Sequence, residues 1–443
     1  MTLSPYPEYK DSGVNWLSQV PGHWGVKRGK FVFRTLKEIN SQLQCNDRLA
    51  LTMKGVIERS TEDVEGLQPA DFMTYQVVEK DDLIFKLIDL QNIKTSRVGL
   101  IPKRGIVSPA YIRIMRTAVV SVAYMFQYYF FLYRNNIFNE LGGSGVRSAI
   151  NAGDLLDISV LVPPINEQET IAAFLDHETA RIDGLIAKQE RLIELLKEKR
   201  QAVISHAVTK GLNPDAPMKD SGVDWLGQVP EHWDVLQLKR MLSDIVYGTS
   251  ESSNDDGEYE VLGMGDIQGG KVLFPGLRFL DDIPRELLIE QGDILFNRTN
   301  SLALVGKCGL VESDAVATFA SYLVRFRTTP NALSAYLNYL LNIDSVLAQA
   351  RGMALPSISQ ANLNPNRYGY IHLCCPPIDE QEDIIGFLAK ETEGFRALIE
   401  KAESAIELMK EHRTALISAA VTGKIDVRGW RAPEQKAEAM TAA

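Results

Sequence analysis

An internal duplication constrains the fold of this chain more than any other feature of its sequence. The segment KDSGVNWLSQVPGHW begins at Lys10 and KDSGVDWLGQVPEHW begins at Lys219, with twelve of fifteen positions identical at an offset of 209 residues. A second pair of matching segments begins with PPINEQE at Pro163 and PPIDEQE at Pro376, at an offset of 213 residues. Self-similarity at a near-constant offset indicates a repeated architecture. The chain therefore contains two copies of one plan.

The two copies share their ends but differ between them. Residues 25–160 and 234–370 have only short echoes in common, such as DDLIF with GDILF. A chain of 443 residues is also too long for one ordinary core. We expect α/β blocks at 1–165 and 213–375, a long helix at 166–212, a second long helix with the C-terminal segment at 376–430, and a disordered tail at 431–443.

The long helices are predicted from apolar residues that recur at alternating three- and four-residue steps, which is a heptad pattern. The first stripe contains Ile171, Leu175, Ile182, Leu185, Leu192 and Leu196, and the second contains Ile384, Leu388, Phe395, Leu398 and Met409. Asn166 and Asp379, each followed three residues later by Glu, are the expected N-caps. A long helix with a single apolar stripe needs a partner. We therefore expect the two helices to pair antiparallel as a coiled-coil spacer between the two blocks, related by an approximate two-fold axis.

Composition narrows the possible function classes. The sequence does not open with the basic start and apolar run of a signal peptide, and its four cysteines have neither disulfide-framework nor zinc-site spacing, so a cytoplasmic protein without a structural metal is expected. The apolar segment from Thr117 to Tyr133 has borderline length for a membrane span and contains Gln127. We interpret it as a buried core helix rather than as a membrane anchor.

The charge of the chain is unevenly distributed. The formal net charge is −10, but residues 1–165 carry 19 basic against 16 acidic side chains, whereas residues 213–375 carry 12 against 20. Phosphate attraction depends on the local field over the contact face, so an acidic total does not exclude DNA binding. It does predict that the second block depends more on a partner for phosphate contacts than the first.

The repeated motifs resemble those of a known family. SGVxWLxxVPxHW at the start of each half, followed by PPIxEQExIxxFL and a long charged helix ending near ISxAVT, is similar to the type I restriction-modification specificity subunit, over nearly the whole chain. The resemblance implies two target recognition domains that read the halves of a bipartite double-stranded DNA sequence. It also implies a spacer that docks two modification (methyltransferase) subunits, with restriction (helicase-nuclease) subunits added. S-adenosylmethionine, ATP and Mg²⁺ would bind those partner subunits, and none of them this chain.

The motifs of catalytic proteins are not matched in this sequence, which agrees with a non-catalytic role. The nearest matches to the amino-methyltransferase loop are VPPI and CPPI, which each fail at two positions. The segment around Gly306 and Lys307 lacks the spacing of a phosphate-binding loop. No catalytic residue is therefore predicted. The open alternatives are an enzyme that acts on DNA alone and a scaffold that binds only proteins.

Candidate DNA-contacting residues are polar or basic side chains in predicted turns, because base edges are read by hydrogen bonds and phosphates attract cations. In the second block these are Thr249, Asn297, Arg298, Thr299, Asn300, Lys307 and Arg351, and in the first block Lys86, Asn92, Lys94, Arg97 and Arg147. Each of them could instead solvate an ordinary turn. The His-Trp pairs at 23–24 and 232–233 occur in both copies, so we expect them to secure the blocks near the helix ends rather than to read bases.

Overall fold

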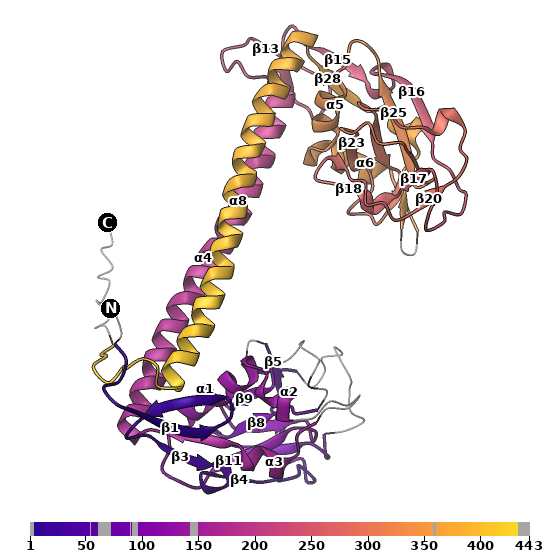
Figure 1. Ribbon diagram of the computed structural model, residues 1–443. Helices are drawn as coiled ribbons and strands as arrows, with labels where there is room; N and C mark the ends of the chain where they lie inside the picture. Colours follow the sequence, from indigo (N-terminus) through magenta and orange to yellow (C-terminus); the bar gives the residue numbers. More distant parts are fainter. Residues whose placement is uncertain are drawn as a thin grey trace. The chain divides into compact units, whose positions relative to one another are not determined.

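The computed structural model describes residues 4–53, 55–60, 72–88, 90, 96–141, 149–357 and 360–432. Of the predicted tail at 431–443, residues 433–443 lie outside these ranges. The chain divides into two compact units. Unit 1 comprises residues 1–189 and 404–443, and unit 2 comprises residues 190–403. Each contains a mixed α/β block together with parts of both long helices (Figure 1).

Unit 1 is built on a four-stranded antiparallel sheet in the order β4-β11-β8-β9. The strands of this sheet are β4 (Phe33–Thr35), β8 (Leu83–Phe85), β9 (Val98–Leu100) and β11 (Ile112–Arg116). Smaller antiparallel pairs are β1 (Tyr9–Val14) with β2 (Leu17–Pro21), β3 (Gly25–Arg28) with β12 (Ser159–Val162), β5 (Leu49–Thr52) with β6 (Gly55–Glu58), and β7 (Gln76–Val78) with β10 (Gly105–Val107).

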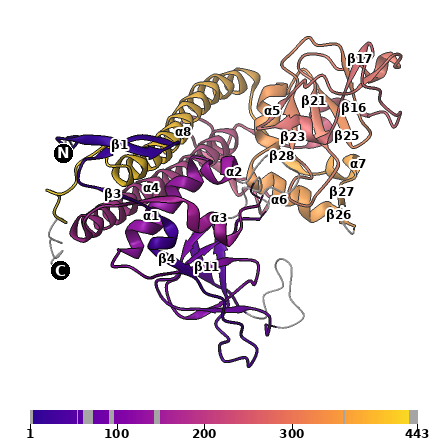
Figure 2. The same cartoon turned by 60° about the horizontal axis from the view of Figure 1, so that its bottom comes forward.

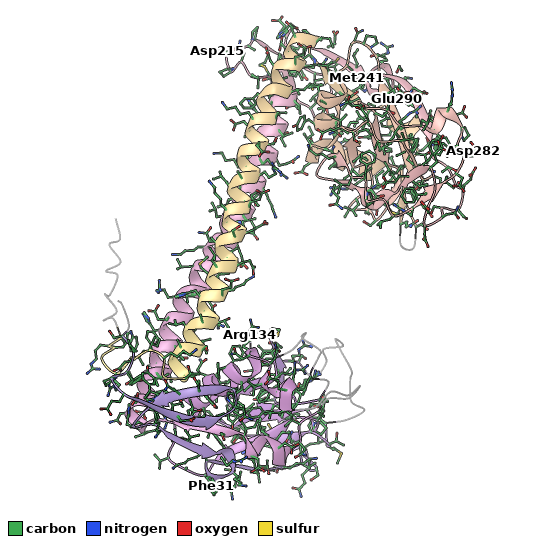
Figure 3. The ribbon with its side chains drawn as sticks, in the orientation of Figure 1. Phe31, Arg134, Asp215, Met241, Asp282 and Glu290 are labelled. Atoms are coloured by element: carbon green, nitrogen blue, oxygen red, sulfur yellow. The ribbon has the colours of Figure 1, made fainter. Side chains whose placement is uncertain are left out.

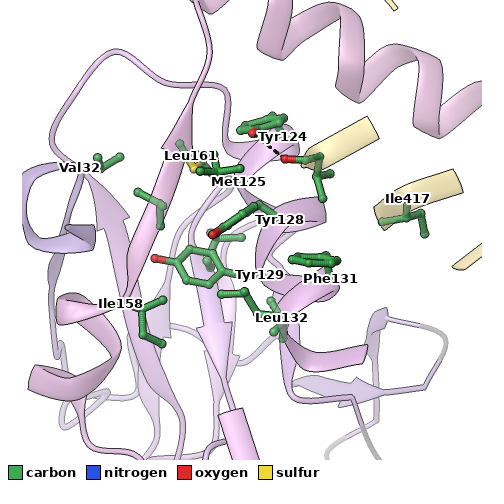
Figure 4. Packing of buried hydrophobic residues seen from close by; sticks show 14 of the residues in the cluster. Val32, Tyr124, Met125, Tyr128, Tyr129, Phe131, Leu132, Ile158, Leu161 and Ile417 are labelled. Atoms are coloured by element: carbon green, nitrogen blue, oxygen red, sulfur yellow. Dashed lines mark hydrogen bonds between the residues drawn. The ribbon is translucent and has the colours of Figure 1, made fainter. Parts of the chain in front are cut away.

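Three short helices complete the block of unit 1: α1 (Val122–Arg134), α2 (Ile137–Leu141) and α3 (Ala152–Asp157). Helix α1 packs against β9, and α3 lies beside β4 (Figures 1 and 2). Tyr124, Tyr128 and Tyr129 of α1 are fully buried among apolar side chains (Figure 4). The apolar segment that raised the question of a membrane span is therefore a 13-residue core helix. Among the described residues, no helix is long and apolar enough to cross a membrane.

Unit 2 repeats this plan with additions. Its main sheet has the order β16-β25-β21-β23-β19-β18, in which the first four strands correspond to β4-β11-β8-β9. These strands are β16 (Leu242–Tyr247), β18 (Ile267–Gln268), β19 (Lys271–Val272), β21 (Ile294–Asn297), β23 (Cys308–Leu310) and β25 (Leu323–Thr328). The remaining strands are β13 (Met218–Asp220), β14 (Gln228–Pro230), β15 (Asp234–Gln237), β17 (Tyr259–Leu262), β20 (Phe279–Leu280), β22 (Thr299–Asn300), β24 (Ala317–Phe319), β26 (Leu355–Pro356), β27 (Ala361–Asn362) and β28 (His372–Cys375).

The helices of the unit 2 block are α5 (Ser334–Leu341), α6 (Asp344–Met353) and α7 (Pro365–Tyr368). The continuous amphipathic pattern of residues 332–350 is divided between α5 and α6. The break follows Asn342, whose side-chain amide donates to the carbonyl of Cys308 on β23 and whose oxygen accepts from the Cys308 backbone N–H. This residue ties the helix pair to the sheet.

The echo between DDLIF and GDILF marks a shared buried ion-pair site. Asp82 accepts from Arg113 Nε at 2.7 Å, and Asp293 accepts from Arg327 Nε at 2.7 Å. Both carboxylates also accept a backbone N–H three residues earlier. The residue before each adopts a positive φ, 69° at Asp81 and 92° at Gly292. The two blocks therefore have the same strand-entry device although most of their sequences differ.

The long helices are α4 (Ile165–Lys210) and α8 (Ile378–Val421). In unit 1 the start of α4 shares a core with the end of α8, and Asp183 pairs with Arg413 at 3.1 Å. In unit 2 the end of α4 shares a core with the start of α8. The two helices are therefore antiparallel within each unit. Because Pro164 and Pro377 lead directly into the helices, Asn166 and Asp379 lie inside the first turn and not before it.

The buried stripes of α4 and α8 deviate from the predicted ones at three positions. Ile171, Leu175, Ile182, Ile384, Leu388 and Phe395 are buried, and Leu196 and Met409 are half-buried. Leu185, Leu192 and Leu398 are 40–51% exposed, while their neighbours Ile186, Ile193 and Ile399 face inward. A four-residue step after Ile182 causes this shift, because 3.6 residues per turn allow either of two adjacent positions to continue a stripe.

The four cysteines differ in reactivity in a way that can be measured. Cys308, Cys374 and Cys375 are buried, and Cys45 is partly exposed. Burial raises the pKa of Cys374 to about 12 and also raises the pKa of Cys308. Because the thiolate is the reactive form, a disulfide reagent should label one thiol quickly in the native protein and all four after unfolding. A Cys45→Ser variant should lose the rapid phase, and rapid labelling of two or more native thiols would contradict this burial.

Candidate nucleic-acid interface

A carboxylate at the start of each long helix connects the two repeated motifs. In unit 1, Glu167 is 5% exposed and accepts hydrogen bonds from His23 Nε2 at 2.8 Å, from Trp24 Nε1 at 2.9 Å and from the hydroxyl of Tyr6. In unit 2, Glu380 accepts from His232 and, at 2.9 Å, from Trp233 Nε1. As expected from their repetition, the His-Trp pairs secure the block to the helix. This structural role argues against base reading by the His-Trp pairs.

The glutamine that follows each of these carboxylates fixes the helix start. Gln168 accepts from the backbone N–H of Ser121, the N-cap of α1, and donates to the carbonyl of Pro163. Gln381 accepts from the backbone N–H of Leu333 and donates to the carbonyl of Pro376. The EQ dipeptide in both copies therefore positions a short helix of the block against the long helix.

The far end of the other long helix docks on the same tryptophan. Gly423 follows α8 with a φ of 73°, and a Cβ there would lie 2.4 Å from Pro21 and 3.2 Å from Trp24. Gly211 follows α4 with a φ of 77° and would bring a Cβ within 3.1 Å of Trp233. Only glycine fits both the backbone conformation and the close approach. The hydroxyl of Tyr124 also donates to the carbonyl of Val421, as Figure 4 shows.

The best-formed polar cluster of unit 2 lies where β21 ends and β22 begins. Asn297, Thr299 and Asn300 are each at most 9% exposed. The backbone N–H groups of Arg298 and Thr299 both donate to the carbonyl of Tyr322. The sheet β22-β27-β26 then holds Thr299 opposite Asn362. The predicted loop is thus a rigid strand-to-strand transition in which backbone pairing fixes the side chains.

Arg298 is the centre of this cluster. Its guanidinium donates to the carbonyl of Ser321 and to Asn362 Oδ1, and it lies 5.3 Å from the ring centre of Tyr247, which is 41% exposed. Arg298 Nε and Asn297 Oδ1 are buried without a hydrogen-bond partner among the described residues. The guanidinium lies over an exposed ring and is held by two weak hydrogen bonds. It is therefore suited to stack on a base or to donate hydrogen bonds to a base or a phosphate.

Comparisons with known proteins show what this chain is similar to. The model of the type I restriction modification DNA specificity domain matches residues 70–195. The chain is 27% identical over 312 residues to the type I restriction enzyme EcoKI specificity subunit of Escherichia coli, covering 68% of this chain and 64% of that protein. It is 23% identical over 363 residues to the MjaVIII specificity subunit of Methanocaldococcus jannaschii, covering 80% and 81%. The chain is thus similar to type I restriction enzyme specificity subunits.

Two solved structures have the same fold as this chain. A chain described under complex assembly and conformational transition of the type I R-M system matches with a TM-score of 0.71 and 15% identity, over 92% of this chain and 99% of that one. The HsdS subunit from Thermoanaerobacter tengcongensis matches with a TM-score of 0.53 and 16% identity, over 92% and 98%. The chain spans just under two thirds of the length of the first relatives it matches.

The other predicted contact residues are placed less uniformly. In unit 2, Lys307 and Arg351 are half-buried, and Arg351 donates to the carbonyl of Ala303. Thr249 is half-buried and its hydroxyl accepts from the N–H of Glu251, in a segment that pairs with Ala320 beside Ser321. The structure therefore brings Thr249 and Arg298 to the same end of the sheet.

In unit 1, Lys86 is half-buried, whereas Arg97 is 1% exposed and donates to the carbonyl of Ile88 at 3.2 Å. Arg97 thus supports the backbone that follows β8. The predicted residues Asn92, Lys94 and Arg147 lie outside the described residues.

Two parts of this site were not predicted from the sequence. Tyr247 and Tyr322 flank Arg298, but isolated tyrosines in a strand give no sequence signal of exposure. The carboxylates Glu167 and Glu380 could have been found, because the EQE motif recurs in both copies at a similar distance from the tryptophan of the His-Trp motif, 143 and 147 residues. When a His-Trp donor pair and a carboxylate acceptor recur together in both copies of a duplicated sequence, they are expected to contact each other.

Proposed function

We propose that this protein is the DNA-specificity subunit of a type I restriction-modification complex and reads an asymmetric, bipartite target. The observation that carries this proposal is a contrast between the two units. They share their core strands and their contacts to the long helices, but their sequences differ where the matching strands end. Both units have the same order of core strands, a buried aspartate at the matching strand that pairs with an arginine, and the same Glu–Trp contact. At the end of the matching strand, however, unit 2 presents Arg298 and Asn300 where unit 1 has a different sequence. Equivalent scaffolds with different readers fit two different half-sites.

The partners follow from the family assignment and belong to this proposal. Two modification subunits would supply S-adenosylmethionine-dependent adenine methylation, and restriction subunits would supply ATP- and Mg²⁺-dependent cleavage. This chain would bind none of these cofactors and would act in the cytoplasm. The acidic second block, with a net charge of −8 over 213–375, favours phosphate contacts supplied by a partner.

The test is to co-express the chain with its modification subunit and to map methylated adenines over a genome. We expect one bipartite, non-palindromic motif, with one methylated adenine in each half. Replacing residues 234–370 with the matching segment of a relative of different specificity should change one half of the motif and leave the other. A continuous or strictly palindromic motif, or a change in both halves, would contradict the proposal.

The two alternatives give different outcomes. The purified chain alone should show no methylation or cleavage of DNA in the presence of S-adenosylmethionine and Mg²⁺, whereas an autonomous enzyme would. A protein-binding scaffold would assemble with its partners but would produce no sequence-dependent methylation pattern. Salt dependence adds a quantitative check, because the slope of log K against log salt reports the phosphates that are neutralised.

A further inference from the structure

Unit 2 contains a pocket of about 210 Å³ beside the carboxylate that joins its repeated motifs. Its walls come from the end of α4, the segment that follows it, the His-Trp motif and the start of α8. The lining residues are Lys210, Gly211, Leu212, Asn213, Ala216, Pro230, His232, Glu380, Asp383 and Ile384. All of them lie within unit 2. No role for this pocket follows from DNA reading, because the lining residues belong to the duplicated frame.

The same place in unit 1 is filled by an aromatic side chain of the chain itself. The ring of Tyr6 is 3% exposed and lies 5.8 Å from the ring of Trp24 and 5.7 Å from that of His23. Its hydroxyl donates to Glu167 Oε1, the oxygen that also accepts from Trp24 Nε1. Burial and the neighbouring carboxylate raise the pKa of Tyr6, so the phenol remains a donor at all physiological pH values. Unit 1 thus shows which chemical group completes this site.

Unit 2 lacks that group. At the repeat offset of 209 residues, Asp215 stands where unit 1 has Tyr6. Asp215 is exposed, on the segment after α4 (Figure 3). Glu380 Oε2 accepts from Trp233, and among the described residues no second donor reaches it. The side chain of Glu380 is 36% exposed, against 5% for Glu167. Both units have a carboxylate that can accept from a phenol hydroxyl, but among the described residues only unit 1 supplies that hydroxyl, from Tyr6.

We propose that the unit 2 pocket receives a tyrosine side chain from a partner protein, with the phenol hydroxyl donating to Glu380 Oε2. The volume is adequate, since a cavity of roughly 150 Å³ holds benzene. The apolar walls are Leu212, Ala216, Pro230 and Ile384, and the single open carboxylate oxygen gives the ring its orientation. A buried ring with a polar tip is also the side-chain type that most often anchors an interface.

A cationic side chain is the alternative occupant, because Glu380 and Asp383 are acidic. Lys210 also lines the pocket, with its ammonium bound to the carbonyls of Leu226 and Gln228, and its charge opposes a second cation. In unit 1 a cation likewise accompanies the phenol, since the Arg428 guanidinium lies 5.0 Å from the ring centre of Tyr6. Both observations favour a neutral phenol.

The occupant comes from another chain, because the segment beside the pocket offers no ring. Residues 211–217, which contribute to the wall of the pocket, read GLNPDAP and contain no aromatic side chain. That the partner is a subunit of the restriction-modification complex rests on the proposed function. The presence and chemistry of the pocket do not rest on it.

The test uses p-cresol as a phenol probe and the full chain as receptor, with binding followed by NMR titration. We expect binding at about millimolar strength, as is ordinary for a ligand of this size, and at least tenfold weaker binding to Asp215→Tyr, whose own ring fills the pocket. Asp220→Tyr, on the exposed strand β13, is the matched control and should bind like the native chain. Equal binding to Asp215→Tyr, no binding to the native chain, or tighter binding of n-butylguanidinium than of p-cresol would each overturn the proposal.

A second arm measures assembly. Asp215→Tyr should weaken association with the modification subunit at least tenfold, while Asp215→Ala leaves it unchanged. The methylated motif, mapped at saturating partner, should be the same for both variants. Unchanged association of Asp215→Tyr would exclude a partner tyrosine in this pocket, and a missing bipartite motif in the native complex would instead refute the proposed function.

Discussion

Replacing Trp24 with alanine should lower the free energy of unfolding of unit 1 by about 3–5 kcal/mol, the usual cost of truncating a large buried aromatic side chain. Trp24 is fully buried, contacts the rings of Tyr6 and Tyr124, and donates to Glu167. Its loss leaves a cavity where the β1–β2 hairpin, α1 and the end of α8 meet. Hydrogen exchange read separately for the two units should show lost protection in unit 1 and unchanged protection in unit 2.

Trp430→Ala is the matched control for this prediction. Trp430 is also in unit 1 but is half-buried, and it contacts the rings of Phe174 and His177 on the surface of α4. Its truncation should cost less, because Trp430 is partly exposed and packs at the margin of the unit 1 core, so less area is returned to water. Equal losses for the two variants would show that Trp24 is not the centre of the unit 1 core.

Replacing Arg298 with alanine should weaken recognition of the second half-site about 10- to 100-fold, equivalent to about 1–3 kcal/mol, if its guanidinium reads a base edge. Methylation in complexes with the modification subunit should become tolerant at one position of that half-site, and the first half-site should remain fully specified. Arg298→Lys should not restore specificity, because an ammonium cannot make the planar two-pronged contact.

Arg285→Ala provides the comparison, since Arg285 is an exposed arginine of the same unit, in the short helix before Leu288, with no contact to the Arg298 cluster among the described residues. A uniform loss of affinity for all sequences, rescued by lysine, would indicate that Arg298 contacts a phosphate instead. Thermal unfolding of Arg298→Ala should be measured alongside, because its contacts with Ser321 and Asn362 are also lost.

The features predicted from the sequence are those that the duplication repeats. The antiparallel helices and the structural role of the His-Trp pairs follow from segments present twice. The exposed Leu185 and Leu192 were placed in the stripe because leucine and isoleucine neighbours are equally apolar, so only packing selects Ile186 and Ile193. Hydropathy cannot choose between adjacent apolar residues.

Buried charge was the other feature that the sequence did not reveal. Arg97, directly before β9, and Arg325, in β25, are fully buried, yet the composition of these segments gives no sign of it. Arg325 donates to the carbonyls of Glu286 and Leu288 and to Asp244, which are 37 to 81 residues away in sequence. Because these partners come from distant segments, tertiary structure alone brings them together. A basic residue in a loop sequence is therefore a weak indicator of a DNA contact.

The close meeting of the two ends of the described chain in unit 1 determines the order in which the protein can mature during synthesis. The N–H of Asp426 donates to the carbonyl of Ser4, and Ile417, Ala420 and Val421 belong to the same core as Trp24. Unit 2 is one uninterrupted stretch, whereas unit 1 lacks part of its core until its second segment, from Ser404 onward, has been translated. Domains usually fold as units as they leave the ribosome, N-terminal first. Here the block of unit 1 is synthesised first but cannot complete its core until the end of synthesis, and it remains exposed to chaperones and proteases until then. The block of unit 2 is synthesised second but can finish folding first.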